Sequence, residues 1–193
     1  IVRSLVGSEM CIRDRIMPLI EHGHCDYGEN KVQEALDKWG QIKLERPELV
    51  LHLIGKLQTN KVKFALKIFD FIHSVDSKKL ANKIYDEQLK QNKKVKIFIQ
   101  VNLGNEVQKS GVLKNDLNEL YLYCMSLKLN VVGLMCIPPV NLDPDPFFHE
   151  LNELNKNLSL KDLSIGMSSD YIKAVENHST YLRVGSAIFG NRI

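Results

Sequence analysis

The sequence contains no long apolar run and no apolar leader. Nowhere do apolar residues extend over the roughly 20 positions that a membrane-spanning helix needs. Charged residues such as Glu9, Arg13 and Asp14 stand where a signal peptide would carry its apolar region. The sequence therefore predicts a cytoplasmic protein with no membrane partner.

Cysteine is scarce and shows no pairing pattern. The four cysteines form no Cys-x-x-Cys motif, and two of them, Cys124 and Cys136, fall in apolar runs, which favours reduced thiols. His22, His24 and Cys25 lie close together in the chain. Adjacent strand residues point to opposite faces and no further ligand cluster is near, so we expect no metal site here.

Charge of either sign is modest. The chain has 26 Lys and Arg against 23 Asp and Glu, a formal net charge of +3. The lysines are scattered through predicted helical stretches such as residues 78–94. This argues against a nucleic-acid partner and leaves a weak positive field that suits a small anion. A hydrophobic content of 44% over 193 residues predicts one folded domain.

What the sequence does contain is a repeated alternation of strands and helices. Short apolar, β-rich runs cover residues 25–27, 50–54, 69–75, 95–103, 131–137, 163–165 and 181–184. The stretches between them have apolar residues at helical spacing, and Ser77 is the expected N-cap of one. Seven or eight such α/β units favour a closed TIM-type (β/α)8 barrel over an open, doubly wound sheet.

The last two strand ends carry the clearest chemistry. One is Gly166-Met167-Ser168-Ser169, with Ser168 or Ser169 as the expected N-cap of the next helix, and the other is Gly185-Ser186. Glycine lets the backbone approach an anion, and free N–H groups at a helix start favour negative charge. Two such turns predict a phosphate site at the barrel mouth. The alternative is that the glycines are only turn residues and Ser168 only a cap.

Two earlier strand ends have both a functional and a structural interpretation. Asn30 suits a hydrogen bond to a ligand's ring substituent, whereas Glu29 and Lys31 are explained equally well as solvated charges at a helix start. His52 alternates with apolar neighbours and is expected to point into the barrel. It serves there either as a buried, hydrogen-bonded side chain or as an acid–base group.

The strand at residues 131–137 offers a third candidate. Met135 suits packing against a flat ligand. An apolar strand closed by Pro138 and Pro139 explains the same residues without any ligand.

Together these segments resemble the pyridoxal phosphate homeostasis proteins, also called the YggS or PROSC family, which are single-domain relatives of the alanine racemase barrel. The resemblance runs in order from about residue 16 to residue 192. Its motifs lie at residues 28–34, 52–61, 109–111, 133–135, 166–168 and 183–190.

The resemblance implies a pyridoxal 5'-phosphate site without catalytic residues of its own. Its implied cofactor-binding residues hold the phosphate (Ser168, Gly185, Ser186), face the pyridine nitrogen (Arg183) and flank the ring (Asn30, Met135). A permanently charged guanidinium discourages protonation of the ring nitrogen and so weakens the cofactor as an electron sink.

The implied function is therefore intracellular cofactor homeostasis with little or no turnover. A monomer would hold pyridoxal phosphate and deliver it to dependent apoenzymes. The alternative function is a barrel isomerase or aldolase acting on a sugar phosphate at the same site, with His52 as acid or base.

The sequence departs from the family pattern at its N-terminal end. The family's first strand ends in a Val-Ser-Lys type sequence whose lysine forms the Schiff base, but residues 1–15 contain no lysine. Arg3, Ser4 and Glu9 interrupt the apolar run, so we expect the first strand to be missing or replaced and two strand edges to stay open. We predict a non-native or aberrant segment at residues 1–15, a barrel domain at residues 16–193, and noncovalent binding.

Overall fold

The computed structural model describes residues 2–7 and 13–190, and strands alternate with helices throughout. The strands are β1 (Arg3–Gly7), β2 (Asp26–Glu29), β3 (Val50–Leu53), β4 (Phe71–Val75), β5 (Lys96–Asn102), β6 (Val112–Leu113), β7 (Asn130–Met135), β8 (Asp162–Met167) and β9 (Tyr181–Val184). The helices are α1 (Arg13–Glu21), α2 (Val32–Glu45), α3 (Val62–Ile68), α4 (Lys78–Gln91), α5 (Leu117–Ser126), α6 (Asp145–Asn157), α7 (Tyr171–Glu176) and α8 (Ser186–Phe189), with 3-10 turns η1 (Thr59–Lys61) and η2 (Lys114–Asp116).

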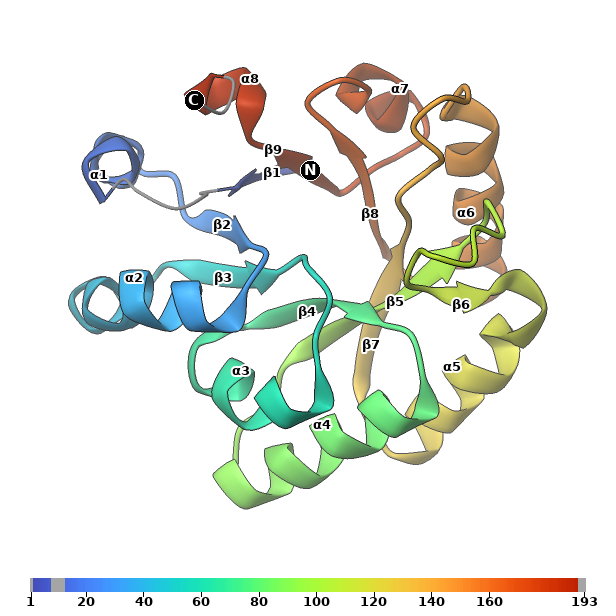
Figure 1. Ribbon diagram of the computed structural model, residues 1–193, viewed down its shortest axis with the longest axis horizontal. Coiled ribbons are helices and arrows are strands. Elements are labelled where there is room, and N and C mark those ends of the chain that lie inside the picture. Colours follow the sequence, from blue (N-terminus) through green and yellow to red (C-terminus); the bar gives the residue numbers. More distant parts are fainter. Residues whose placement is uncertain (1, 8–12, 191–193) are drawn as a thin grey trace.

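The strands form a closed parallel barrel. Within the described ranges the sheet has nine strands in the order β4-β3-β2-β1-β9-β8-β7-β5-β6, and β4 also pairs with β5. This last pairing closes a ring of eight strands, with β6 attached outside it to β5. The longer helices lie around the outside of the ring (Figure 1). The predicted TIM-type barrel is therefore confirmed, and each of the seven predicted runs overlaps a strand.

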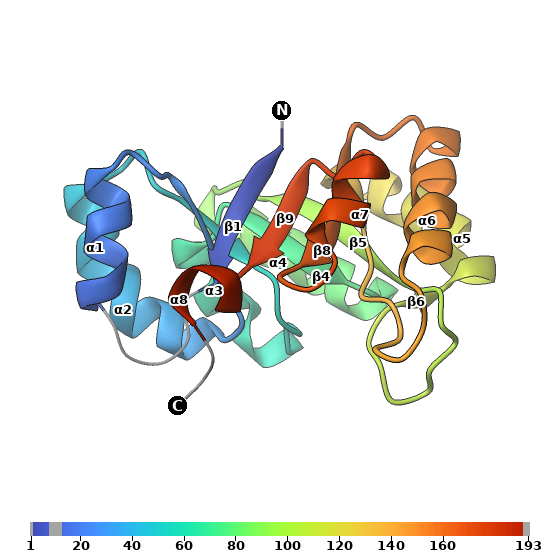
Figure 2. The ribbon, with the colours of Figure 1, turned by 90° about the horizontal axis from the view of Figure 1, so that it is seen from above.

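The structure contradicts the expectation of a missing first strand with two open strand edges, and the alternative of a replaced first strand stays a prediction. β1 pairs in parallel with β2 on one side and with β9 on the other, with Leu5 opposite Arg183. Figure 2 shows β1 lying beside β9. The side chains of Leu5 and Val6 are buried, at 0% and 2% exposure. Two central apolar residues are thus enough for this short strand.

The polar residue that appeared to interrupt the strand lies at its amino end. Arg3 is half exposed there, donates to the Tyr181 hydroxyl at 3.1 Å and lies 3.9 Å from a carboxylate oxygen of Asp26. An arginine at a barrel rim keeps its charged group near water while its stem packs. Arg3 therefore does not prevent β1 from closing the barrel.

The barrel has two packed layers. The larger apolar cluster fills the space between strands and helices and includes Trp39, Leu51 and Phe148. A smaller cluster lies inside the ring and consists of Leu5, Phe71, Phe98, Met135 and Tyr181. No helix in the described part of the chain is both long and apolar enough to cross a membrane.

We expect Leu5→Ala to lower the free energy of unfolding by about 2–5 kcal/mol, because it empties part of the cluster inside the ring. Val2→Ala is the matched control, since Val2 is 46% exposed, and it should change stability by less than about 0.5 kcal/mol. Chemical denaturation of both variants measures the difference. Equal stability of the two would contradict a structural role for β1.

Candidate functional site

The two predicted phosphate-binding turns meet at the ends of β8 and β9. The Ser168 hydroxyl, just after β8, accepts hydrogen bonds from the backbone N–H groups of Gly185 (3.2 Å) and Ala187 (3.4 Å), just after β9. Ser186 is exposed beside them as the first residue of α8. Two backbone N–H groups thus converge on one oxygen, that of Ser168, and an anion placed there would accept from the same donors.

The expectation that Ser168 or Ser169 caps the following helix is wrong. α7 begins at Tyr171 and is preceded by Asp170, whose carboxylate accepts from the N–H of Met167 at 2.5 Å. The acidic side chain thus closes the turn between β8 and α7. Because Ser168 is not needed as a cap, its hydroxyl is directed to the neighbouring turn.

Gly166 has a structural role in the same turn. Its φ is +90°, and a Cβ at this position would lie 2.5 Å from the Cβ of Ala174 and 2.8 Å from a methyl of Leu182. A side chain would therefore push α7 away from β8. For Gly166, the interpretation as a turn and packing residue explains its conformation.

Arg183 is buried inside the barrel near the end of β9, with 7% exposure. Its Nη1 donates to the carbonyl oxygen of Ser164 at 2.7 Å and to the Ser164 hydroxyl at 2.9 Å, and its Nη2 donates to the carbonyl of Cys136 at 2.8 Å. All three acceptors are neutral oxygens. Burial lowers the pKa of the guanidinium, yet arginine stays protonated in proteins.

A line of polar side chains leads from Arg183 through the barrel interior. The Ser164 hydroxyl lies 2.9 Å from Nδ1 of His73, and Nε2 of His73 lies 3.0 Å from Nδ1 of His52. Nε2 of His52 lies 3.1 Å from a carboxylate oxygen of Asp26. The prediction that His52 points into the barrel is confirmed, and its hydrogen bonds to other barrel side chains favour the structural interpretation.

Sequence reasoning missed His73 and Ser164 as members of this line. His73 stands two residues after Phe71 in β4, so both point into the barrel. A histidine in alternation with an inward-facing aromatic residue was the available signal. Nothing local marks Ser164, because its partners come from other strands.

The interior histidines are held neutral. Burial lowers the pKa of His52 and outweighs the opposing effect of the Asp26 carboxylate. Burial also lowers the pKa of His73 well below its ordinary value, with further lowering by His52 and by the charge of Arg183. The pKa of Asp26 is lowered in turn, because its hydrogen bond with His52 and the nearby charges outweigh the effect of burial. At neutral pH the line therefore has an anionic end, two neutral rings and a cationic end.

Asn30 borders a cavity at the carboxyl ends of the strands. This cavity has a volume of about 260 Å³ and is lined by Asn30, Ile54, Gly55, Lys56, Gln100, Asn102, Lys109, Ser110 and Ile137. A Cβ on Gly55 would lie 2.2 Å from the carbonyl oxygen of Asn30. Only glycine allows the chain after β3 to pass this close to the end of β2.

The other two candidates near these strand ends lie in different surroundings. Glu29 is 1% exposed and accepts from the Trp39 indole at 2.6 Å and from Lys38 at 3.0 Å, so it is not a solvated charge. Lys31 is exposed and pairs with Glu34. Met135 is fully buried in the cluster inside the ring, so its packing there is explained without a ligand.

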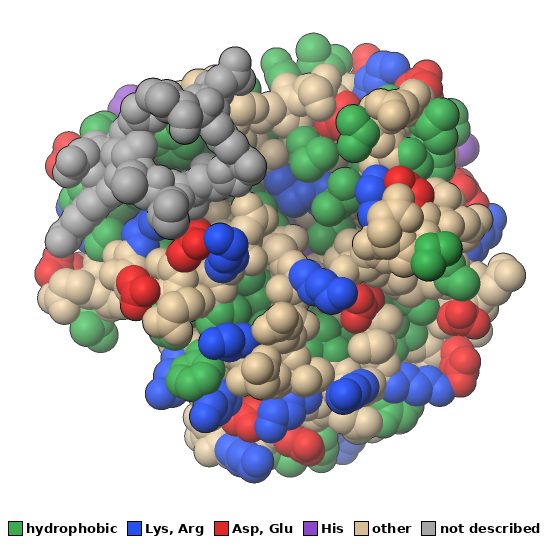
Figure 3. Space-filling view, in the orientation of Figure 1, with side chains coloured by type: hydrophobic (Ala, Val, Ile, Leu, Met, Phe, Trp, Pro, Cys, Tyr) green, Lys and Arg blue, Asp and Glu red, His purple; other side chains and the backbone are tan. Residues whose placement is uncertain are grey.

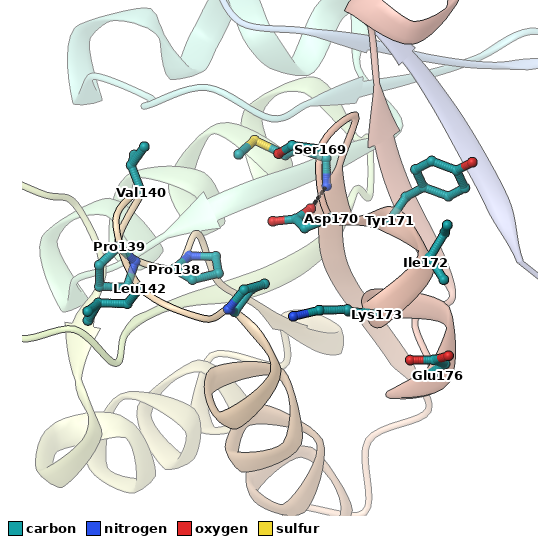
Figure 4. Close-up of a pocket in the computed structure, with 12 residues that line it drawn as sticks. Pro138, Pro139, Val140, Leu142, Ser169, Asp170, Tyr171, Ile172, Lys173 and Glu176 are labelled. Atoms are coloured by element: carbon teal, nitrogen blue, oxygen red, sulfur yellow. Dashed lines mark hydrogen bonds between the residues drawn. The ribbon is translucent and has the colours of Figure 1, made fainter.

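A larger cavity of about 640 Å³ lies between α7 and the loop after β7. Figure 4 shows Pro139, Val140 and Leu142 on one side and Tyr171 and Lys173 on the other. Lys173 pairs with Asp143 across this region at 2.8 Å. The Ser168 hydroxyl is directed to the turn after β9, so we place the candidate site at the strand ends rather than here.

On the face seen in Figure 3, many of the basic side chains lie over α3 and α4, with acidic side chains among them. Lys61, Lys63 and Lys67 lie within 6 Å of the Phe64 ring, at 4.6 to 5.9 Å from its centroid. In the described ranges, no group of three or more His, Cys, Asp or Glu side chains is arranged to hold a metal ion. Arg183 supplies a buried positive charge at the strand ends.

Residues 13–192 match the family model of the alanine racemase N-terminal domain, which gives the class of barrel. A relative from Aquifex aeolicus, a pyridoxal phosphate homeostasis protein, is 42% identical over 176 residues, covering 86% of this chain and 76% of the relative. The protein of the same name from Vibrio alginolyticus is 34% identical over 190 residues, covering 93% of this chain and 82% of the relative. The chain belongs to the pyridoxal phosphate homeostasis protein family.

A solved structure agrees with this assignment. PipY from Synechococcus elongatus, with pyridoxal phosphate bound, superposes with a TM-score of 0.90 at 32% identity, covering 98% of this chain and 92% of PipY. The alternative of an isomerase or aldolase for sugar phosphates receives no support from these relatives.

We expect Ser168→Ala to lower the free energy of unfolding by about 1 kcal/mol, because two backbone donors lose their shared acceptor. Ser169→Ala is the matched control: its side chain is exposed and its removal should change stability by less than about 0.5 kcal/mol. Denaturant titration checks the pair. A neutral Ser168→Ala would show that the two turns are not coupled through this hydroxyl.

Proposed function

We propose that this protein binds pyridoxal 5'-phosphate noncovalently at the carboxyl ends of the barrel strands and carries it in the cell without turning over a substrate. The observation that supports this most directly is Arg183, a buried guanidinium at the end of β9. It lies two residues before Gly185, whose N–H group faces the Ser168 hydroxyl. One strand end thus supplies both a cation and an anion-binding turn.

The phosphate group fits the turns after β8 and β9. The N–H groups of Gly185 and Ala187 point toward one hydroxyl, that of Ser168. Ser186 adds a second, exposed hydroxyl at the same helix start. We assign Ser168, Gly185 and Ser186 to the phosphate on this basis.

The pyridine ring fits beside Arg183. Its Nη1 and Nη2 bond Ser164 and Cys136, and no hydrogen bond to a described residue engages its Nε–H. Within the described part of the chain this N–H has no acceptor, and it suits an unprotonated ring nitrogen. Bound pyridoxal phosphate supplies an aldehyde and an electron-withdrawing ring. By keeping its own charge at the ring nitrogen, Arg183 disfavours ring protonation and thus a strong electron sink.

We propose that no amine captures the aldehyde end of the ligand covalently. Residues 1–15 contain no lysine, and the Lys109 amine pairs with Glu106 at 2.5 Å and donates to the carbonyl of Pro138 at 3.2 Å. Lys56 lines the cavity beside Asn30 but is exposed. The ring would therefore be held by contacts alone, with Asn30 and Met135 as its proposed neighbours.

A noncovalent ligand leaves more readily than a covalently bound one, which suits a carrier. We propose a cytoplasmic monomer that passes the cofactor to dependent apoenzymes. The free thiols of Cys25, Cys124 and Cys136 support a reducing compartment. We also propose that residues 1–15 are a non-native segment that lacks the family's lysine although it supplies β1.

Borohydride reduction in the presence of pyridoxal phosphate, followed by peptide mass mapping, tests the noncovalent mode. We expect the wild-type chain to bind the cofactor in a calorimetric titration and to carry no phosphopyridoxyl group. Pyridoxine 5'-phosphate, which has an alcohol in place of the aldehyde, should bind within about threefold of the cofactor. A stoichiometric label on any lysine would refute this mode, and tighter binding of a sugar phosphate would refute the function.

A lysine introduced at the end of β1 provides the positive control. Position 7 is two residues beyond Leu5, whose side chain points into the barrel, and alternate strand residues share a face. We expect Gly7→Lys to become labelled after reduction and Gly7→Met to stay unlabelled. An unlabelled lysine at position 7 would contradict the proposed position of the aldehyde.

A further inference from the structure

Five polar side chains cross the barrel interior in one unbroken series of hydrogen bonds. In order they are Asp26, His52, His73, Ser164 and Arg183, and successive contacts measure 3.1, 3.0, 2.9 and 2.9 Å. Asp26 is the first residue of β2, and Arg183 is the penultimate residue of β9. The series therefore connects the amino end of the barrel to the proposed ligand site at the carboxyl end. We refer to it as the interior relay.

The two ends of the interior relay determine the direction of every bond in it. Arg183 is a donor only, and the ionised Asp26 is an acceptor only. His52 must therefore donate from Nε2 to Asp26 and accept at Nδ1. His73 must then donate from Nε2 and accept at Nδ1 from the Ser164 hydroxyl, which in turn accepts from Arg183. Each histidine has one possible neutral tautomer.

Aromatic packing holds the two imidazole rings in this arrangement. The His52 ring stacks on Phe71 with centroids 4.4 Å apart and planes 17° apart, and the His73 ring stacks on Phe98 at 4.2 Å and 22°. Both histidines are 0% exposed. A ring fixed by stacking and by two directed hydrogen bonds cannot rotate without leaving a buried polar atom unpaired.

We propose that His52, His73 and Ser164 are positioning residues for Arg183, and that the interior relay aims the free Nε–H of Arg183 at the ring nitrogen of the bound ligand. This inference rests on the proposed function, because it assumes pyridoxal phosphate at the site. The interior relay gives the guanidinium a neutral acceptor, the Ser164 hydroxyl. The compensating carboxylate, that of Asp26, lies at the other end of the barrel. The charge of Arg183 therefore remains directed toward the ligand.

The test compares pyridoxal 5'-phosphate with 1-deazapyridoxal 5'-phosphate, in which carbon replaces the ring nitrogen. Both carry the same phosphate and aldehyde, so the ratio of their Kd values isolates the contact at the ring nitrogen. For the wild-type chain we expect the deaza analogue to bind about tenfold more weakly, since a hydrogen bond from a charged donor is lost. Isothermal titration calorimetry measures both constants.

Two variants interrupt the relay at different points. His73→Phe keeps a ring against Phe98 but removes both hydrogen bonds, and Ser164→Ala removes only the hydroxyl between His73 and Arg183. We expect the Kd ratio to fall toward one in each, with binding of the deaza analogue changed less than about threefold. Ser164→Thr, which retains a hydroxyl, should restore the ratio.

The matched control is Ser74→Ala. Ser74 is the next residue of β4, is buried, and its hydroxyl has no hydrogen-bond partner. The Ser74→Ala variant should keep the Kd ratio of the wild-type chain. Thermal unfolding of each variant confirms that it is folded, and Ser164→Ala keeps the test open if His73→Phe does not fold.

The outcomes separate this inference from the proposed function. If Ser164→Ala and a folded His73→Phe keep the Kd ratio of the wild-type chain, the positioning role is overturned, whereas cofactor binding is left intact. A wild-type ratio near one would show that Arg183 does not engage the ring nitrogen and would also overturn it. No binding of either ligand to the wild-type chain would overturn the proposed function and the inference together.

Discussion

Closure of the parallel ring is the constraint on which the rest of this structure depends. The groups at the candidate site come from three strand ends: Asn30 follows β2, Ser168 follows β8, and Arg183, Gly185 and Ser186 belong to the end of β9. Without β1 the ring would open, and β2 and β9 would lie at its two edges. The pairing of β1 with both strands brings them to a common mouth. The short strand β1, which contains no lysine, is therefore the strand that assembles the site.

Much of this architecture could be predicted from the sequence because it depends on local periodicity. Apolar runs and helical spacing indicated seven of the eight barrel strands. β1 was not predicted because only Leu5 and Val6 supply buried apolar side chains. Its stabilising partners are remote in sequence, as the separation of 178 between Arg3 and Tyr181 shows. A local pattern cannot indicate such pairing.

The site shows the same difference between features that a local pattern indicates and contacts between residues remote in sequence. The turns around Ser168 and Gly185 were predicted because glycine, serine and a strand end stand together in each. His73 and Ser164 were not, because their contact joins strands 91 positions apart, and the one local signal was the alternation of His73 with Phe71 in β4. The sequence pattern placed one polar side chain, His52, inside the barrel. The ring encloses the whole interior relay, whose polar groups are tolerated because successive members hydrogen-bond to one another.

The pairing of β1 with β9 has a consequence for how the chain folds. During synthesis β1 appears early, but the partner for one of its edges is not complete until residue 184 has been made. Until then a partly formed sheet presents two unpaired edges, the kind of surface that invites aggregation. Folding that depends on contacts between remote segments is also slow, because the entropy of closing the chain is lost before the contacts form. Chaperone demand and synthesis rate would thus decide how much of this protein reaches its native form.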